Sequence, residues 1–140
     1  MEKKQHTLGF LLARASNSMA MYLNSVLRKE GIDLPHSQFV ILKRLYFQDG
    51  ISQQELADLV FKDTSAIKRT LDILEKKGLI ERIPVTMRKN SIKITDAGRA
   101  LTPKVMDCLE RSKETCLHGI SEDEYRMLTG ILERIHQNIN

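Results

Sequence analysis

The chain is poor in residues that interrupt helices, with three prolines and seven glycines among its 140 residues. It also lacks any apolar run close to the roughly 18 residues that a membrane-spanning helix needs. Its first residues, Met1 to His6, are polar and charged, unlike the apolar stretch of a signal peptide. These absences predict a largely helical, cytoplasmic protein with no membrane partner, and the length favours one domain.

Residues that commonly carry enzyme or metal chemistry are also few. Cys108 and Cys116 fall on the apolar side of a predicted helix, about 12 Å apart and beyond disulfide reach. Free cysteines in that setting are usually core residues, so an oxidant-sensing thiolate is the less favoured alternative. The four histidines are scattered, and Cys116 with His118 supplies too few ligands for a metal site. No nucleophile–base pair and no phosphate-binding glycine loop is evident. The sequence therefore predicts no enzyme, no metal and no cofactor.

Positive charge is concentrated in the middle of the chain. The net charge is +4, and the segment from Ser52 to Thr95 holds nine Lys or Arg against six Asp or Glu. Between Arg82 and Lys93 there is no acidic residue. Such clustering is typical of a protein that binds a polyanion such as nucleic acid. A basic face that contacts only solvent has the same composition, so charge alone leaves both interpretations open.

Apolar spacing predicts four helices, a hairpin and two further helices. The hairpin is indicated by strand-like alternation at Ile80/Arg82 and at Ile92–Ile94, on either side of a polar, basic segment. Pro103 predicts a break or kink in the fifth helix, with Thr102 as a fresh cap. The six helices are predicted to begin, in order, at Thr7, Pro35, the Ser52–Glu55 capping box, Asp63 or Thr64, Thr95 and the Ser121–Glu124 capping box. Residues that end a helix follow the first helix at Gly31, the second at Asp49-Gly50 and the fourth at Gly78.

This order predicts a mainly α fold with a small β-hairpin wing: a winged helix-turn-helix flanked by N- and C-terminal dimerisation helices. Residues 35–101 would form the DNA-binding region, and residues 1–34 and 102–140 the dimerisation region of one intertwined domain. The first helix would be a rod of roughly 34 Å, with little to bury against in so small a chain. The last helix would expose an apolar face in a monomer, so we expect a homodimer. That face carries Leu128, Ile131, Leu132 and Ile135.

The fourth predicted helix suits the major groove of double-stranded DNA, where the first residues of a helix reach base edges. With Ile67, Leu71 and Leu74 inward, helical geometry places Lys68 and Arg69 on the opposite side. At the hairpin tip, an arginine suits a narrow minor groove. The predicted DNA-binding residues are Ser52, Gln53, Thr64, Ser65, Ala66, Lys68, Arg69, Arg88 and Lys89.

Two alternatives compete with this interpretation. Structurally, the fourth helix could be an ordinary exposed amphipathic helix and the hairpin tip a solvated basic loop. Functionally, the chain could be a winged-helix protein-interaction module without specific DNA binding. Strong salt dependence of DNA binding would distinguish them, because phosphate contacts release counterions.

Several local patterns occur together in the stretch from Ser37 to Leu101. They are Gln38-Phe39, QQELAD from Gln53, LDILEKKGLIER from Leu71 and ITDAGRAL from Ile94. In this order and spacing the chain resembles the MarR family of transcriptional regulators, and the flanking helices extend the resemblance over nearly the whole chain. The resemblance implies a triangular homodimer whose recognition helices enter successive major grooves of a palindromic operator. It also implies repression, commonly relieved by a small aromatic effector bound between the dimerisation and DNA-binding parts.

The resemblance assigns Arg88 as the wing arginine. Thr86 replaces the aspartate that the family often has two residues earlier, Phe61 replaces a frequent turn glycine, and Pro103 is atypical of the fifth helix. The resemblance also implies a pocket for the aromatic effector, and four residues near the second helix could line it. Packing in the hydrophobic core would account for the same four residues. These residues are Met19, Tyr22, Phe39 and Tyr46. The operator, the effector and the regulated genes are not specified by the sequence.

Overall fold

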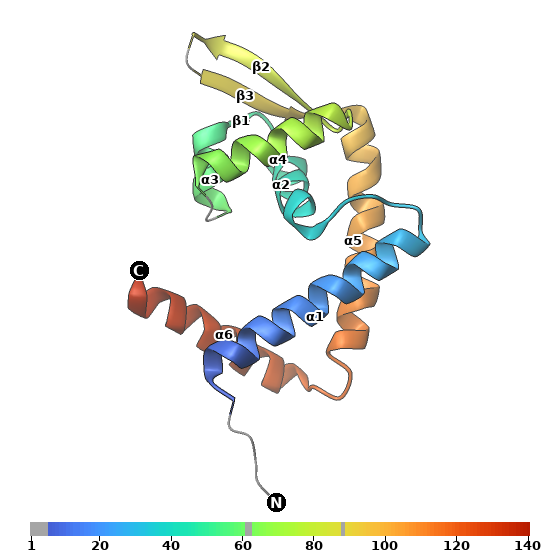
Figure 1. The fold of residues 1–140 in the computed structure, drawn as a ribbon, viewed down its shortest axis with the longest axis vertical. Helices are drawn as coiled ribbons and strands as arrows, with labels where there is room; N and C mark the ends of the chain where they lie inside the picture. The colour runs from blue at the N-terminus through green and yellow to red at the C-terminus, as the bar shows by residue number, and fades with distance from the viewer. Residues whose placement is uncertain (1–5, 61–62, 88) are drawn as a thin grey trace, which may run out of the picture.

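The computed structural model of the chain describes residues 6–60, 63–87 and 89–140. One end of the molecule is a winged lobe, residues 36–94, built from α2, β1, α3, α4, β2 and β3 (Figure 1). At the other end lie α1 and α6, which we call the helical base, and the long helix α5 runs from one end to the other (Figure 1). The bounds are α1 Leu8–Lys29, α2 His36–Phe47, β1 Ile51–Ser52, α3 Gln53–Leu59, α4 Thr64–Lys76, β2 Ile80–Thr86, β3 Lys89–Ile94, α5 Asp96–Cys116 and α6 Glu122–Ile139. This order confirms the predicted fold class, a mainly α winged helix-turn-helix with flanking helices.

The helices begin where the sequence places capping residues. Thr7, Asp63 and Thr95 each accept a hydrogen bond from a backbone N–H three residues further on. Ser52 and Ser121 form complete capping boxes at the starts of α3 and α6. Each cap satisfies a backbone donor that has no partner inside its helix, which defines the first turn.

A three-stranded antiparallel sheet forms the wing, in the order β1-β3-β2. Ile80 pairs with Ile94 at the base of the β2–β3 hairpin, and Ile51 of β1 pairs with Ile92 on the other side of β3. The β2–β3 hairpin confirms the hairpin predicted from the sequence. Its strands extend beyond the alternating residues Ile80/Arg82 and Ile92–Ile94 from which it was predicted. The strand β1 was not predicted, because two residues carry no periodicity.

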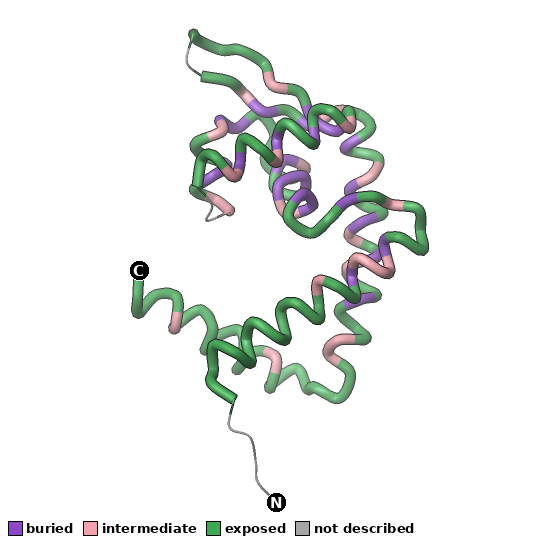
Figure 2. The backbone as a smooth tube through the Cα atoms, viewed as in Figure 1, coloured by how far each residue is buried: buried purple, intermediate pink, exposed green. Residues whose placement is uncertain are grey.

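One hydrophobic core fills the winged lobe and continues between the adjoining parts of α1 and α5 (Figure 2). Leu27 of α1 and Val105 of α5 are fully buried in it, together with Leu42 and Leu45 of α2. The helical base differs, since α6 has no buried residue and α1 buries only Leu23 and Leu27.

The start of α5 fits tightly against the sheet. A Cβ atom at Gly98 would lie 2.4 Å from the carbonyl oxygen of Leu79, so only glycine allows this approach. Asp49, two residues after the end of α2, accepts a hydrogen bond from the backbone N–H of Ile94 and forms an ion pair with Arg99 of α5 at 2.9 Å. These contacts fix α5 directly to the base of the wing.

The predicted break at Pro103 is wrong, because α5 continues through it to Cys116. Pro103 is exposed, while Thr102 and Val105 on either side are buried, so packing holds both parts of the helix on the core. Thr102 is not a fresh cap: its hydroxyl donates to the carbonyl of Gly98 inside the helix, at 2.7 Å. Tertiary packing thus offsets the one hydrogen bond that proline removes.

Across the described residues, no helix combines the length and apolar character needed to cross a membrane. Nor do three or more His, Cys, Asp or Glu side chains in these ranges gather where they could hold a metal ion. Both cysteines are free, and Cys108 is buried whereas Cys116 is partly buried.

Candidate nucleic-acid interface

The helix α4 has one buried side and one polar, exposed side. Its first turn is set by Asp63, which accepts a hydrogen bond from the backbone N–H of Ala66 at 2.7 Å. Ala66 itself is partly buried. The buried residues are Ile67, Leu71 and Leu74, and the exposed ones are Thr64, Ser65, Lys68 and Arg69. The structure therefore brings these predicted residues together on the face of α4 that points away from the core.

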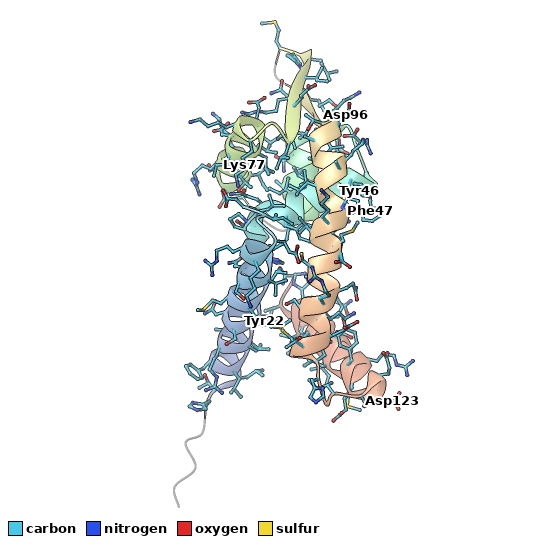
Figure 3. All side chains as sticks on the ribbon, turned by 90° about the vertical axis from the view of Figure 1, so that its right-hand side faces the viewer. Tyr22, Tyr46, Phe47, Lys77, Asp96 and Asp123 are labelled. Carbon is cyan, nitrogen blue, oxygen red and sulfur yellow. The ribbon has the colours of Figure 1, made fainter. Side chains whose placement is uncertain are left out.

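The far end of α4 is tied to the rest of the lobe by Lys77 (Figure 3). Its Nζ donates to the carbonyl of Asp33 at 2.8 Å and to Oε1 of Gln38 at 2.7 Å. Gln38 is buried at the start of α2. These hydrogen bonds fix the orientation of α4 relative to the helix behind it.

The start of α3 holds Ser52 and Gln53, which the sequence placed among the DNA-binding residues. Ser52 is buried, and its hydroxyl accepts the backbone N–H of Glu55 while it also pairs in β1. Its side chain is thus engaged inside the lobe and is not presented to a ligand. Gln53 is partly buried and lies beside it on the first turn of α3.

The wing extends from the lobe as the hairpin of β2 and β3 (Figure 1). Lys89 is exposed at the start of β3, and the preceding residue, the predicted wing arginine Arg88, lies outside the described residues. Met87 is fully exposed at the tip, an apolar feature that the sequence reasoning did not single out. Lys68, Arg69 and Lys89 take part in none of the ion pairs found among the described residues. Their charges are therefore available to an external anion.

Arg82 joins the wing to α4, a contact that the sequence reasoning missed. From β2, its guanidinium donates to Oδ1 of Asp72 at 2.5 Å and to Oε1 of Glu75 at 2.7 Å, both on α4. The hydrogen bond from Arg82 lowers the pKa of the Glu75 carboxyl, and that from Glu75 raises the pKa of Arg82. Both groups are therefore charged at neutral pH.

The MarR family profile matches residues 34–86, which span α2 to the end of β2. The HTH-type transcriptional regulator YybA of Bacillus subtilis is 29% identical over 131 residues, covering 92% of this chain and 84% of YybA. A second regulator from that organism, YdgJ, is 34% identical over 109 residues, covering 76% of this chain and 66% of YdgJ. This chain belongs to the MarR family of transcriptional regulators.

Solved MarR-family structures agree with the arrangement of both ends of the molecule. A mutant MarR from E. coli complexed with operator DNA superimposes with a TM-score of 0.84 at 25% identity, covering 91% of this chain and 92% of that one. A putative MarR family regulator from Listeria monocytogenes complexed with 26mer DNA superimposes with a TM-score of 0.82 at 26% identity, covering 96% of this chain and 90% of that one.

The four residues offered as an effector pocket, one methionine and three aromatic residues, differ in their surroundings in the single chain. Phe39 is 2% exposed in the core, and Met19 is 46% exposed on α1. Figure 3 shows Tyr22 well below Tyr46, whose ring packs edge-on against Phe47 with centroids 5.2 Å apart.

Two surface hollows lie elsewhere in this MarR-family chain. One, about 730 Å³ in volume, lies between the end of α1 and α5 and is lined by residues that include Ile32, Cys108 and Arg111. The other, about 340 Å³, lies at the turn from α5 to α6 and includes Lys113 and Tyr125. Neither of these two hollows is lined by Met19, Tyr22, Phe39 or Tyr46.

Proposed function

We propose that this chain is a sequence-specific regulator that binds double-stranded DNA through α4 and the wing. The observation that carries the proposal is the exposed side of α4, where Lys68 and Arg69 have no ion-pair partner among the described residues, next to a wing bearing Lys89. A helix fits the major groove and a basic hairpin suits the adjacent phosphates or minor groove. Two related structures are complexes with DNA, which supports the same use of this surface.

The DNA-binding residues we propose are those that the structure leaves exposed or partly exposed on this surface. Ser52 is omitted, because its hydroxyl caps α3 from a buried position. Arg88 stays in the proposal because the sequence predicts it at the basic hairpin tip and the family resemblance assigns it as the wing arginine. The proposed set is Gln53, Thr64, Ser65, Ala66, Lys68, Arg69, Arg88 and Lys89.

The chain acts as a homodimer in this proposal. Apolar side chains at the start of α1 and along α6 are exposed in the single chain, among them Leu8 at 60%, Met127 at 65% and Leu128 at 44%. Patches of this kind usually mark a protein contact, and a second copy supplies an equal surface. Two symmetry-related winged lobes would then contact two half-sites of a palindromic operator about one helical turn apart.

Repression and release by a small aromatic effector are the finer parts of the proposal, and both derive from the MarR resemblance. A dimer seated on a promoter blocks other proteins from the same DNA, which favours repression. Calorimetric titration of the protein with salicylate-like aromatics tests whether such a compound is the effector. Binding that weakens the affinity for DNA supports it, and the absence of heat change counts against this ligand class.

The DNA proposal is tested by titrating the purified protein against its own upstream intergenic DNA and against a scrambled duplex at two salt concentrations. We expect tight binding to the native fragment, weaker binding to the scrambled one, and loss of affinity with salt, because counterions are released from the phosphates. No binding to either duplex at low salt would favour the protein-interaction module. In that case Lys68, Arg69 and Lys89 would be ordinary solvated charges.

A further inference from the structure

The wing and α4 must hold a fixed relative position if both are to contact one stretch of DNA. The side chain of Arg82 makes two hydrogen bonds that join β2 to α4. Arg82 lies two residues from Ile80 on β2, so both side chains point to the face of the hairpin that covers α4. Its side chain is 18% exposed, which indicates that the guanidinium is held between the strand and the helix.

The partners of Arg82 lie close to the proposed DNA-binding side chains. Asp72 is four residues after Lys68 and three after Arg69, so helical geometry places it on the same exposed side of α4. Glu75 follows one turn later, and the side chains of Asp72 and Glu75 are 52% and 43% exposed. Two unpaired carboxylates there would repel phosphates and reduce the local positive potential.

Resting on the proposed function, we propose that Arg82 is a positioning residue for DNA binding, which holds the wing against α4 and offsets part of the negative charge of two carboxylates beside the DNA-binding side chains. Arg82 does not itself contact DNA in this role, because its guanidinium is directed to Asp72 and Glu75. This separates it from Lys68 and Arg69, which face outward.

One guanidinium nitrogen of Arg82, Nη2, makes both hydrogen bonds. It carries two N–H donors, so it can hold two carboxylates on consecutive turns of α4. A lysine keeps the charge but places it on a flexible ammonium in place of the planar guanidinium. The lowered pKa of Glu75 is consistent with an ionised, hydrogen-bonded pair at neutral pH.

The experiment measures the operator affinity of the full-length protein at several salt concentrations for Arg82→Gln, Arg82→Lys and the triple variant Arg82→Gln/Asp72→Asn/Glu75→Gln. We expect Arg82→Gln to weaken binding about tenfold, equivalent to about 1.4 kcal/mol, with an unchanged slope of log K against log[salt]. Arg82→Lys should lose less, since it keeps the charge. The triple variant should regain part of the affinity lost in Arg82→Gln, because the carboxylate charges are gone.

Matched variants give the reference values. Arg69→Gln should reduce the salt slope by about one, as expected for a lost phosphate contact. Arg126→Gln breaks an exposed ion pair with Asp123 on α6, at 2.7 Å in the structure, and should leave operator affinity unchanged. Thermal unfolding of each variant separates loss of folding from loss of binding. If Arg82→Gln does not fold, the affinity of Arg82→Lys is compared with that of the native protein.

The outcomes separate this inference from the proposed function. If the native protein does not bind its operator, the proposed function fails and the role of Arg82 fails with it. If the native protein binds and all Arg82 variants bind equally well, the inference alone is overturned. A salt slope in Arg82→Gln that falls by about one overturns it as well, because Arg82 would then be a direct phosphate contact.

Discussion

In the winged lobe, the apolar side of α4 is covered by its own chain, and Ile67, Leu71 and Leu74 have no exposed surface. In the helical base, α6 has a similarly regular apolar spacing and no buried residue (Figure 2). The apolar side of α4 is thus covered within the chain, whereas that of α6 is open to solvent in the single chain. Amphipathic spacing in a sequence therefore specifies a buried face without specifying whether the same chain or another one buries it.

The strongest test of this comparison places a charge on the exposed apolar face of α6. Leu128→Asp should convert the proposed dimer to a monomer, because an ionised carboxylate in an apolar interface is costly. Light scattering at micromolar concentration should then show half the native mass. Glu133→Gln on the same helix is the control and should leave the mass unchanged. A native protein that is already monomeric would contradict the homodimer.

A matched pair of leucine truncations compares the two regions directly. Leu71→Ala should lower the free energy of unfolding by about 2–5 kcal/mol at any protein concentration, since its cavity lies inside one chain. The loss for Leu128→Ala should instead depend on protein concentration, because a second copy supplies the cover. Urea denaturation at several protein concentrations measures both. Equal, concentration-independent losses would remove the distinction between the lobe and the base.

Charge substitutions sharpen the comparison in functional terms. Arg69→Ala on α4 should weaken operator binding by about 1–3 kcal/mol if Arg69 contacts a base or phosphate. Arg126→Ala in the helical base should change operator affinity little, because its partner is Asp123 of the same helix. Fluorescence anisotropy with labelled operator measures both. An equal loss in the two variants would contradict the assignment of DNA binding to the winged lobe.

The two capping boxes give the smallest expected difference. Ser52 is 7% exposed, whereas Ser121 is exposed, although both accept the backbone N–H of a glutamate three residues later. Loss of a capping side chain costs about 0.5–2 kcal/mol, and the uncapped donor in α3 has less access to water. Ser52→Ala should therefore lie at the upper end of that range and Ser121→Ala at the lower end, by urea denaturation. The reverse order would show that burial does not set the cost.

Much of the fold could be predicted because its signals are local. Caps such as Asp63 and Thr95, and glycine at Gly78, where φ is 76°, mark boundaries by their own chemistry. The exposed side of α4 followed from helical geometry once the apolar side was recognised. These features depend on residues within a few positions of each other, which a single sequence displays.

The features that escaped prediction depend on contacts between distant parts of the chain. Whether Arg82 meets Asp72 and Glu75 depends on how the hairpin lies on α4, which spacing does not reveal. The continuity of α5 at Pro103 depends on packing against α1 and α2, which outweighed the local rule for proline. For the same reason Ser52 was recognised as a cap and not as a buried residue.

Because α5 is continuous, a tilt of this helix relative to the helical base would move the winged lobe and, in the proposed dimer, change the distance between the two lobes. Its 21 residues span roughly 31 Å, and its two ends are attached to the wing and to the turn before α6. A tilt of about 10° would displace the upper end by about 5 Å, more than the rise of about 3.4 Å between base pairs. Pro103 removes one backbone hydrogen bond from this arm, so its bending stiffness is lowest there. In the proposed dimer, the distance between the two winged lobes could thus be adjusted at Pro103, which lies outside both the proposed DNA-binding residues and α6.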